Sequence, residues 1–414
     1  MEIDPFNEVD NLVLAELAYT DFGGIVPGLN QKGQWITIRE AHDRFFSMYS
    51  EEEIMAKNST TKVAPFLMHK MVASARFQNL RLMNYVNEID EENQTQFSVL
   101  SFLLDDDRVY VAFRGTDNTI VGWKEDFNMS FLYQTEGQIR AAQYLNDCYG
   151  DTSYELLVGG HSKGGNFAVY ASAFCQPAIQ DRITCVYSND GPGFLKEITT
   201  QESYERIMPR VVSTIPESSI VGMLLENEMD HRVVKSSQTG AMQHDAMSWE
   251  VLGNHFVFAE NLSESSVMLD RTLKNWIYGL SAEEREEFVN ILFGTLQSTG
   301  ATTLDELTAN KFSMMTNISK TLSAMPVEKQ QVLKDVICRF AYSSGETFAD
   351  NVQEKLFHNP LSERLMNTTK SICYKLRWMW KNFYIRQLAA VYRLETFPWK
   401  MQRYMVCRKH WMTC

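Results

Sequence analysis

The sequence predicts an α/β fold in which a largely parallel sheet is flanked by helices. Between residues 96 and 236, short apolar runs alternate with helical patterns, as strands and crossover helices do in parallel sheets. One of these runs leads into a glycine-rich turn that opens a helix. After about residue 265 the apolar spacing is helical throughout. The expected organisation is an α/β domain over residues 1–265 with a helical N-terminal segment, a helical region packed on it over 266–369, and a C-terminal tail over 370–414.

The individual elements follow from local patterns of apolar and turn-forming residues. Apolar residues at helical spacing predict helices over 11–19, 38–49, 65–79, 139–149 and 166–174, and we expect the chain up to about residue 85 to be helical. Apolar runs between turn signals predict strands over 96–104, 108–114, 154–158, 183–187, 210–215 and 233–236, the first two forming a hairpin. Further along, Ser281 and Glu284 fit a capping box that begins a helix, and Gly300 is its expected stop.

Composition is that of a soluble globular protein. The 414 residues are 44% hydrophobic and 22% charged, and no apolar run approaches the roughly 18 residues of a transmembrane helix. The acidic N-terminus lacks the basic and apolar regions of a signal peptide. Seven cysteines without CxxC spacing indicate reduced thiols in a cytoplasm, not a disulfide framework or a zinc site. The sequence has no phosphate-binding loop, dinucleotide fingerprint or metal-ligand spacing, so we expect no cofactor and no metal.

The C-terminal tail differs in charge from the rest of the chain, whose total net charge is −13. Residues 370–414 hold ten Lys or Arg, a single acid (Glu395) and ten aromatic residues, so the tail carries +9 and the remaining residues carry −22. A basic, aromatic segment on an acidic body is typical of a surface-binding element. The alternatives are docking on the protein's own acidic body, peripheral contact with a membrane surface, and binding of another partner; nucleic acid is not the expected one.

The most informative motif is Gly160-His161-Ser162-Lys163-Gly164-Gly165. It lies between the predicted strand 154–158 and the predicted helix 166–174. This is the context of a nucleophile elbow, a strained turn that exposes a serine hydroxyl above the end of a sheet. Glycines meet the need for small flanking residues, and the N-terminus of the following helix faces any negative charge that develops. We therefore expect Ser162 to be a nucleophile.

A serine nucleophile needs a histidine base, and the chain has eight histidines. Three of them lie downstream within the predicted sheet region. His244 follows the last predicted strand in a loop, which suits a general base. His231, among charged residues, and His255, in an apolar context, are the alternatives.

The histidine in turn needs an orienting acid. Asp190 follows the predicted strand 183–187 just before a glycine turn, and parallel strands gather site residues at their carboxyl ends. Turn capping is the structural alternative for this residue. Glu217, after the next predicted strand, is the alternative acid, and Asp230 and Asp245 remain open.

An oxyanion intermediate needs two backbone donors. The N–H of Lys163, directly after the nucleophile, is the first candidate. The loop Phe113-Arg114-Gly115-Thr116-Asp117 follows an early strand, and Thr116 would offer its N–H and its hydroxyl. A simple β-turn is the structural alternative for this loop.

Three of these motifs together resemble the class 3, fungal-type lipases. That family's F-R-G-[ST] loop is matched at 113–116, its D-W-x-x-D-like stretch at 122–126 and its G-H-S-L-G-G elbow at 160–165, in the same order and spacing. Over roughly residues 8–300 the chain is still more similar to an uncharacterised bacterial branch, the domain-of-unknown-function family 2974. The features of that branch appear here at 12–19, 190–194, 219–224 and 243–245.

The resemblance implies an α/β-hydrolase fold with a serine-dependent, cofactor-free hydrolase site. Two departures from the lipase pattern stand out. Lys163 replaces the usual leucine, and its ammonium either attracts an anionic substrate or pairs with an acid. The stretch 218–221 lacks the aspartate that the lipases carry after the later strand, which moves the acid to Asp190 or Glu217 and leaves room for weakened or lost activity.

Together the residues and the resemblance predict a cytoplasmic serine hydrolase, lipase- or esterase-like. It would cleave a carboxylic ester or thioester of a small molecule or a lipid through Ser162, His244 and Asp190, with an acyl-enzyme intermediate. One alternative is acyl transfer to an alcohol or amine in place of water. The other is a non-catalytic binding or scaffold protein on a degenerate hydrolase fold.

Overall fold

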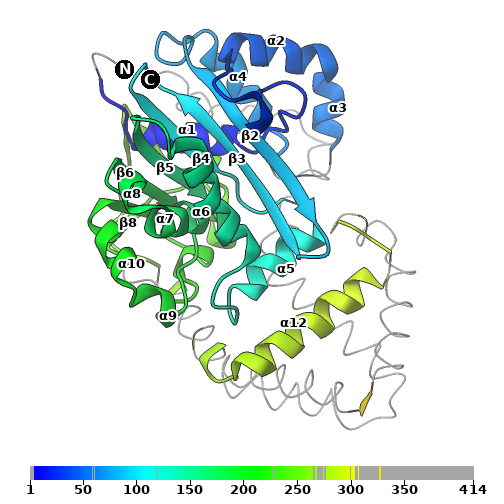
Figure 1. Ribbon diagram of the computed structural model, residues 1–414. Coiled ribbons are helices and arrows are strands. Elements are labelled where there is room, and N and C mark those ends of the chain that lie inside the picture. Colours follow the sequence, from blue (N-terminus) through cyan, green and yellow to red (C-terminus); the bar gives the residue numbers. More distant parts are fainter. Residues whose placement is uncertain are drawn as a thin grey trace.

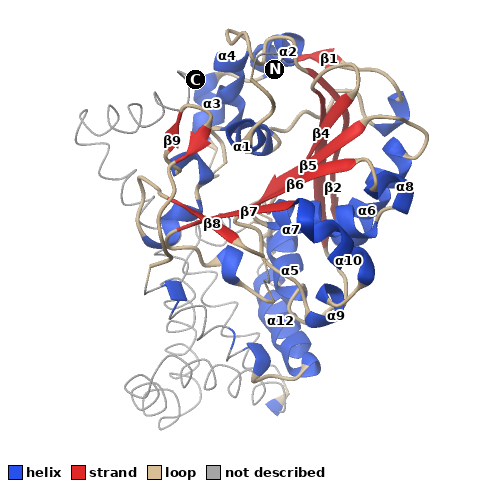
Figure 2. Cartoon of the chain, turned by 90° about the vertical axis from the view of Figure 1, so that its left-hand side faces the viewer, coloured by secondary structure: helices blue, strands red, loops and turns tan. Residues whose placement is uncertain are grey.

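The computed structural model describes residues 4–263 apart from 58, 60, 118, 227 and 228, together with 266–267, 274, 277–298, 300–303, 306 and 326–327. These residues form a sheet with helices on both faces, and helix α12 (Ala282–Gln297) lies beside it (Figures 1 and 2). Most of the predicted helical region 266–369 and all of the tail 370–414 lie outside the described residues. Within the described part, no helix is long and apolar enough to cross a membrane.

Eight strands follow one another across the main sheet in chain order. They are β1 (Ile36–Thr37), β2 (Arg81–Asp90), β3 (Thr95–Leu103), β4 (Arg108–Phe113), β5 (Glu155–His161), β6 (Ile183–Asn189), β7 (Val211–Pro216) and β8 (His231–Val234). Strands β4 to β8 pair in parallel and β1 to β4 pair antiparallel, so the sheet is mostly parallel. A separate hairpin joins β9 (Val251–Leu252) and β10 (His255–Phe256). The predicted fold class, that of the α/β-hydrolases, is confirmed.

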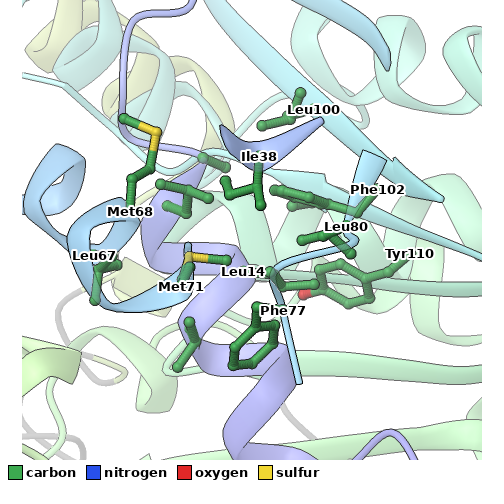
Figure 3. Close-up of a cluster of buried hydrophobic side chains, with 14 of the residues drawn as sticks. Leu14, Ile38, Leu67, Met68, Met71, Phe77, Leu80, Leu100, Phe102 and Tyr110 are labelled. Carbon is green, nitrogen blue, oxygen red and sulfur yellow. The ribbon is translucent and has the colours of Figure 1, made fainter. Parts of the chain in front are cut away.

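The helices divide between the two faces of this sheet (Figure 2). They are α1 (Glu8–Leu17), α2 (Ile38–Met48), α3 (Glu51–Ala56), α4 (Leu67–Met71), α5 (Ile120–Asn128), α6 (Glu136–Tyr149), α7 (Lys163–Phe174), α8 (Pro177–Gln180), α9 (Lys196–Thr199) and α10 (Glu202–Ile207). On one face α6 and α7 pack against strand residues such as Val111. On the other face α1, α2 and α4 enclose a core in which Leu14 lies near Phe102 and Tyr110 (Figure 3). Val111 and Tyr110 face opposite sides because successive strand side chains alternate.

The N-terminal part differs from the prediction. Residues 81–90 form strand β2, although the chain up to about residue 85 is expected to be helical. The apolar residues of this segment suit either period, and antiparallel pairing with β3 decides the outcome. The ladder shifts register between Met83 and Val86, beside Asn84 with its φ of 54°, as at a β-bulge. The helix predicted over 65–79 is also shorter, since α4 ends at Met71.

Other predicted elements are confirmed within a few residues. The strands predicted between 96 and 236 appear as β3 to β8. The capping box of α12 is present, with Glu284 N–H donating to Ser281 Oγ at 3.2 Å. Helix α5, which the sequence patterns do not predict, packs against α12, and the rings of Phe127 and Phe293 meet edge to face at 5.4 Å. Of the seven cysteines, the three that the structure describes are free thiols: Cys148, Cys175 and Cys185.

Candidate active site

Ser162 occupies the tight turn between β5 and α7, where the sequence predicts a nucleophile elbow. Its backbone angles, φ 58° and ψ −132°, are strained for a residue with a side chain. The turn is held by its surroundings, and Ser162 N–H donates to Asn189 O at 2.9 Å. The positions that flank the serine must be glycine because other parts of the backbone lie too close to leave room for a Cβ atom. A Cβ on Gly160 would clash with the backbone of Gly164, and a Cβ on Gly164 would clash with the carbonyl of Phe113.

Three predicted site residues from distant parts of the chain form one hydrogen-bonded chain. The hydroxyl Oγ of Ser162 lies 3.0 Å from His244 Nε2. On the other side of the ring, His244 Nδ1 lies 2.6 Å from Asp190 Oδ2. The sheet accounts for this arrangement, since Ser162 and Asp190 directly follow the carboxyl ends of the neighbouring parallel strands β5 and β6. His244 reaches them from a short 3-10 helix, Gly240–His244.

Asp190 is fully buried and accepts several hydrogen bonds. Its Oδ2 atom faces His244. Its Oδ1 atom accepts from Ser219 Oγ at 2.5 Å and from Gly222 N–H at 3.1 Å. Burial alone would raise the pKa of Asp190, but the hydrogen bonds from His244 and Ser219 outweigh it and lower the pKa below its ordinary value. The carboxylate is therefore ionised and fixed in orientation. Glu217, the alternative acid, lies past the end of β7 and is half-buried.

The two alternative histidines are engaged elsewhere. His231 begins β8, and its Nδ1 atom lies 2.8 Å from Ser213 Oγ. The side chain of His255 is 70% exposed, and its Nδ1 atom lies 3.9 Å from Glu8 Oε1 at the hairpin of β9 and β10. Of the three histidines predicted as candidates, His244 is the one hydrogen-bonded to Ser162.

The loop after β4, in which the sequence places Thr116 as an oxyanion donor, lies against the elbow. A Cβ on Gly115 would come within 3.1 Å of Ser162 Cβ and 2.6 Å of His161 O, so this loop approaches the turn as closely as glycine allows. Thr116 Oγ1 donates to Asp126 Oδ2 at 2.6 Å, which ties the loop to α5. Burial raises the pKa of Asp126 to about 7.

Lys163 contributes its backbone and its side chain in different places. Its N–H is the first of helix α7, at the end where backbone donors have no partner within the helix. Its side chain points into the core instead, where Nζ lies 2.7 Å from Glu125 Oε2 and 3.0 Å from Gln96 O. Of the two roles that the sequence left open for the ammonium, pairing with an acid is the one found.

Sequence reasoning missed a set of polar residues around the site. Ser219 supports Asp190, and the buried Glu16 and His161 form a cluster beside the elbow with the half-buried Tyr19. The ring of His161 lies tilted by 35° against that of His244, with centroids 4.7 Å apart. The sequence offers two indications of these residues: His161 lies within the elbow motif, and Tyr19 lies within the stretch 12–19. Neither position indicates a partner without the fold.

No group of His, Cys, Asp or Glu residues within the described part of the chain is arranged to hold a metal ion. The polar residues at the elbow are instead used in hydrogen bonds to one another. The arrangement as a whole offers a hydroxyl beside an imidazole, an ionised acid behind it, and the N-terminus of helix α7 directly after the serine. These are the parts that nucleophilic attack on a carbonyl requires.

Comparison with known proteins adds a family. The model of the Mbeg1-like family matches residues 71–294, which is more than half of the chain and includes Ser162, Asp190 and His244. The chain belongs to the Mbeg1-like family. By family and fold it is a lipase-like α/β-hydrolase, whereas class 3 and family 2974, the finer names drawn from the sequence, stay predictions.

Several solved lipase structures are similar to this chain, at low sequence identity and low TM-scores. M37 lipase is 14% identical with a TM-score of 0.32, over 53% of this chain and 70% of that one. A fungal lipase–inhibitor complex is 14% identical with a TM-score of 0.33, over 55% and 79% of the two chains. Rhizomucor miehei lipase with its propeptide is 14% identical with a TM-score of 0.31, over 46% and 65%. None of the curated proteins matches the chain.

Proposed function

We propose that this Mbeg1-like protein is a serine hydrolase that cleaves a carboxylic ester or thioester through an acyl-enzyme. The observation that carries the proposal is the hydrogen-bonded series Ser162, His244 and Asp190 on a strained elbow. A serine merely capping a helix would have no need of an imidazole at 3.0 Å backed by a buried, ionised carboxylate. Membership of a lipase-like family supports the same reaction class.

In the proposed mechanism His244 is the general base. As Oγ of Ser162 attacks the carbonyl carbon of the substrate, Nε2 of His244 takes its proton, and Asp190 stabilises the resulting imidazolium through Nδ1. The carbon–oxygen or carbon–sulfur bond then breaks, and the leaving alcohol or thiol takes the proton from Nε2. Water, deprotonated in turn by His244, hydrolyses the acyl-enzyme and restores Ser162.

The negative charge of the tetrahedral intermediates falls on the former carbonyl oxygen. We propose the backbone N–H groups of Lys163 and Thr116 as its donors, because they belong to the two segments that pack against Ser162. The N-terminus of α7 adds the favourable end of its helix dipole. Held in advance, these donors stabilise charge without reorganisation.

The substrate class we propose is an acyl ester of a small molecule or a lipid. The triad acts on the acyl carbonyl and does not select the acyl chain or the alcohol, so both must be measured. A panel of p-nitrophenyl acetate, butyrate, octanoate and palmitate would report the preferred acyl length directly.

The test compares ester hydrolysis by the purified full-length wild type, Ser162→Ala and the control Ser172→Ala. Ser172 lies on the same helix α7, and its hydroxyl donates to Ala168 O one turn earlier, at 2.7 Å. We expect the control to match the wild type and Ser162→Ala to lose about a thousandfold or more in kcat. Hydrolysis that persists in a folded Ser162→Ala would overturn the proposal.

A further inference from the structure

Helix α1 lies beneath the candidate site, and every one of its residues is buried. Just beyond its C-terminus, the hydroxyl of Tyr19 reaches the elbow. It lies 3.1 Å from His161 Nδ1 and 3.5 Å from His161 O, and it packs against Gly115, in the loop that precedes Thr116. The contact with that loop is close, since a Cβ on Gly115 would clash with the Tyr19 hydroxyl.

The ring of His161 connects the Tyr19 hydroxyl to the backbone of His244. Its Nε2 atom lies 2.9 Å from the backbone carbonyl of His244. Because a carbonyl only accepts, Nε2 carries the hydrogen. Burial, with the charge of His244, lowers the pKa of His161 to about 3, so the ring is neutral and Nδ1 is an acceptor. The hydrogen bonds therefore run in one direction, from Tyr19 O–H to His161 Nδ1 and from His161 Nε2–H to His244 O.

We propose that Tyr19 is a positioning residue for this site: its hydroxyl holds the Gly115–Thr116 loop and, through His161, the backbone of His244. One side chain thereby couples the oxyanion loop to the segment that carries the general base. The inference rests on the proposed function, because it assigns the hydroxyl a role in aligning groups that act in ester cleavage. Small displacements of such groups reduce kcat far more than they reduce substrate binding.

A second group faces the same nitrogen. Glu16 Oε1 lies 3.4 Å from His161 Nδ1, and both side chains are buried. Burial, with the charge of Asp245, raises the pKa of Glu16 to about 8, so this carboxyl is protonated at neutral pH. Tyr19 is the nearer partner and the one that also reaches the Gly115 loop, so removal of its hydroxyl has the larger predicted effect on catalysis.

The test measures kcat and KM for p-nitrophenyl butyrate on the full-length wild type, Tyr19→Phe and the control Tyr149→Phe. Tyr149 is buried on the opposite face of the sheet, where its hydroxyl donates to Ser101 Oγ at 2.6 Å. We expect Tyr19→Phe to lose about tenfold to a hundredfold in kcat with KM changed less than about threefold, and the control to keep its kcat. Loss of a hydrogen bond should lower the thermal stability of both variants.

Variants of His161 provide a second arm of this test. Gln in its place still offers an N–H to the His244 carbonyl but has no acceptor at the position of Nδ1, whereas Leu offers neither group. We expect His161→Gln to retain more activity than His161→Leu, and Tyr19→Phe to cost less kcat in the His161→Gln background than in the wild type because coupled residues are not additive. This arm also tests the proposal if Tyr19→Phe alone does not fold.

A readout that does not depend on activity separates this inference from the proposed function. The low-field proton resonance of His244 Nδ1–H reports its bond to Asp190, and we expect it to shift or broaden in Tyr19→Phe and to stay unchanged in Tyr149→Phe. An active wild type with an equally active Tyr19→Phe and an unmoved resonance would overturn the inference. An inactive wild type whose resonance still responds to Tyr19→Phe would contradict the proposed function and leave the positioning role supported.

Discussion

Lys163, the residue after the candidate nucleophile, directs its ammonium away from the site and onto Glu125. The two side chains are each 1% exposed, and Nζ lies 2.7 Å from Oε2. Glu125 also accepts from the backbone N–H groups of Gln96 and Gly137, at 3.1 and 3.0 Å. The pair therefore joins α5, α6, α7 and β3 directly behind the elbow.

Breaking this pair on one side should destabilise the protein strongly. Lys163→Met leaves the buried Glu125 carboxylate without its counter-charge, and we expect the free energy of unfolding to fall by about 3–5 kcal/mol. Urea unfolding of the single variant and of Lys163→Met/Glu125→Gln measures this. The double variant should lose less than the sum of its two single variants, and strictly additive losses would contradict a coupled pair.

Ser219 should tune the acid of the triad. Ser219→Ala removes the 2.5 Å hydrogen bond to Asp190 Oδ1, so the pKa of Asp190 should rise from its lowered value toward the ordinary range. A more basic carboxylate holds the His244 proton more tightly. We expect kcat to fall about tenfold and the acid limb of the kcat/KM profile to move to higher pH.

The neighbouring Ser218→Ala is the matched control for this measurement. The Ser218 hydroxyl lies 3.3 Å from that of Ser263, whereas the Ser219 hydroxyl donates to Asp190. Its profile should coincide with that of the wild type. An acid limb and a kcat that Ser219→Ala leaves unmoved would show that this hydroxyl has no bearing on the site.

The Thr116 hydroxyl should matter through Asp126. Thr116→Val preserves the shape of the side chain but removes the donor 2.6 Å from Asp126 Oδ2, which frees the loop from α5. We expect kcat to fall about tenfold to a hundredfold with little change in KM, as when an oxyanion donor is displaced. Thr116→Ser restores the hydroxyl and should recover most of the activity; equal kcat values in the Val and Ser variants would contradict this role.

Glu16 should make stability depend on pH. Its pKa is about 8 in the folded protein and about 4.5 when exposed, so between these values the folded state holds a proton that the unfolded state has released. Its contribution to the free energy of unfolding therefore falls as pH rises from about 4.5 to about 8, by about 1.4 kcal/mol per unit of pKa difference at most. In urea unfolding over this range, the free energy of unfolding of Glu16→Gln should increase relative to that of the wild type as pH rises. A constant difference between them would contradict a raised pKa.

Features set by local chemistry could be predicted from the sequence. The strand, glycine turn and helix around Ser162 are contiguous, so the elbow is visible in a single stretch of chain. Most of the strands β3 to β8 are rich in apolar residues and bounded by turn signals, and their order follows the chain. Strand β2 was missed because its apolar spacing also suits a helix, and pairing with β3 settles its conformation.

Features set by tertiary contact could not be predicted in the same way. Asp190 and Glu217 both follow strands, and only the fold brings Ser219 and Gly222 onto Asp190. The hydrogen bond of Tyr19 to His161 joins residues 142 positions apart, and no periodicity reports it. The domain boundaries, the cytoplasmic location and the role of the tail 370–414 stay predictions, and the tail lies outside the described residues.

The central claim is that Ser162 is an activated nucleophile. Its most direct test is to label the purified full-length protein with a fluorophosphonate and to locate the adduct by peptide mass spectrometry, with Ser162→Ala and Ser172→Ala alongside. The account predicts a single adduct on Ser162 in the wild type and in Ser172→Ala, and none in Ser162→Ala. Folded wild-type protein that takes up no label, or a label that persists in Ser162→Ala, would contradict it.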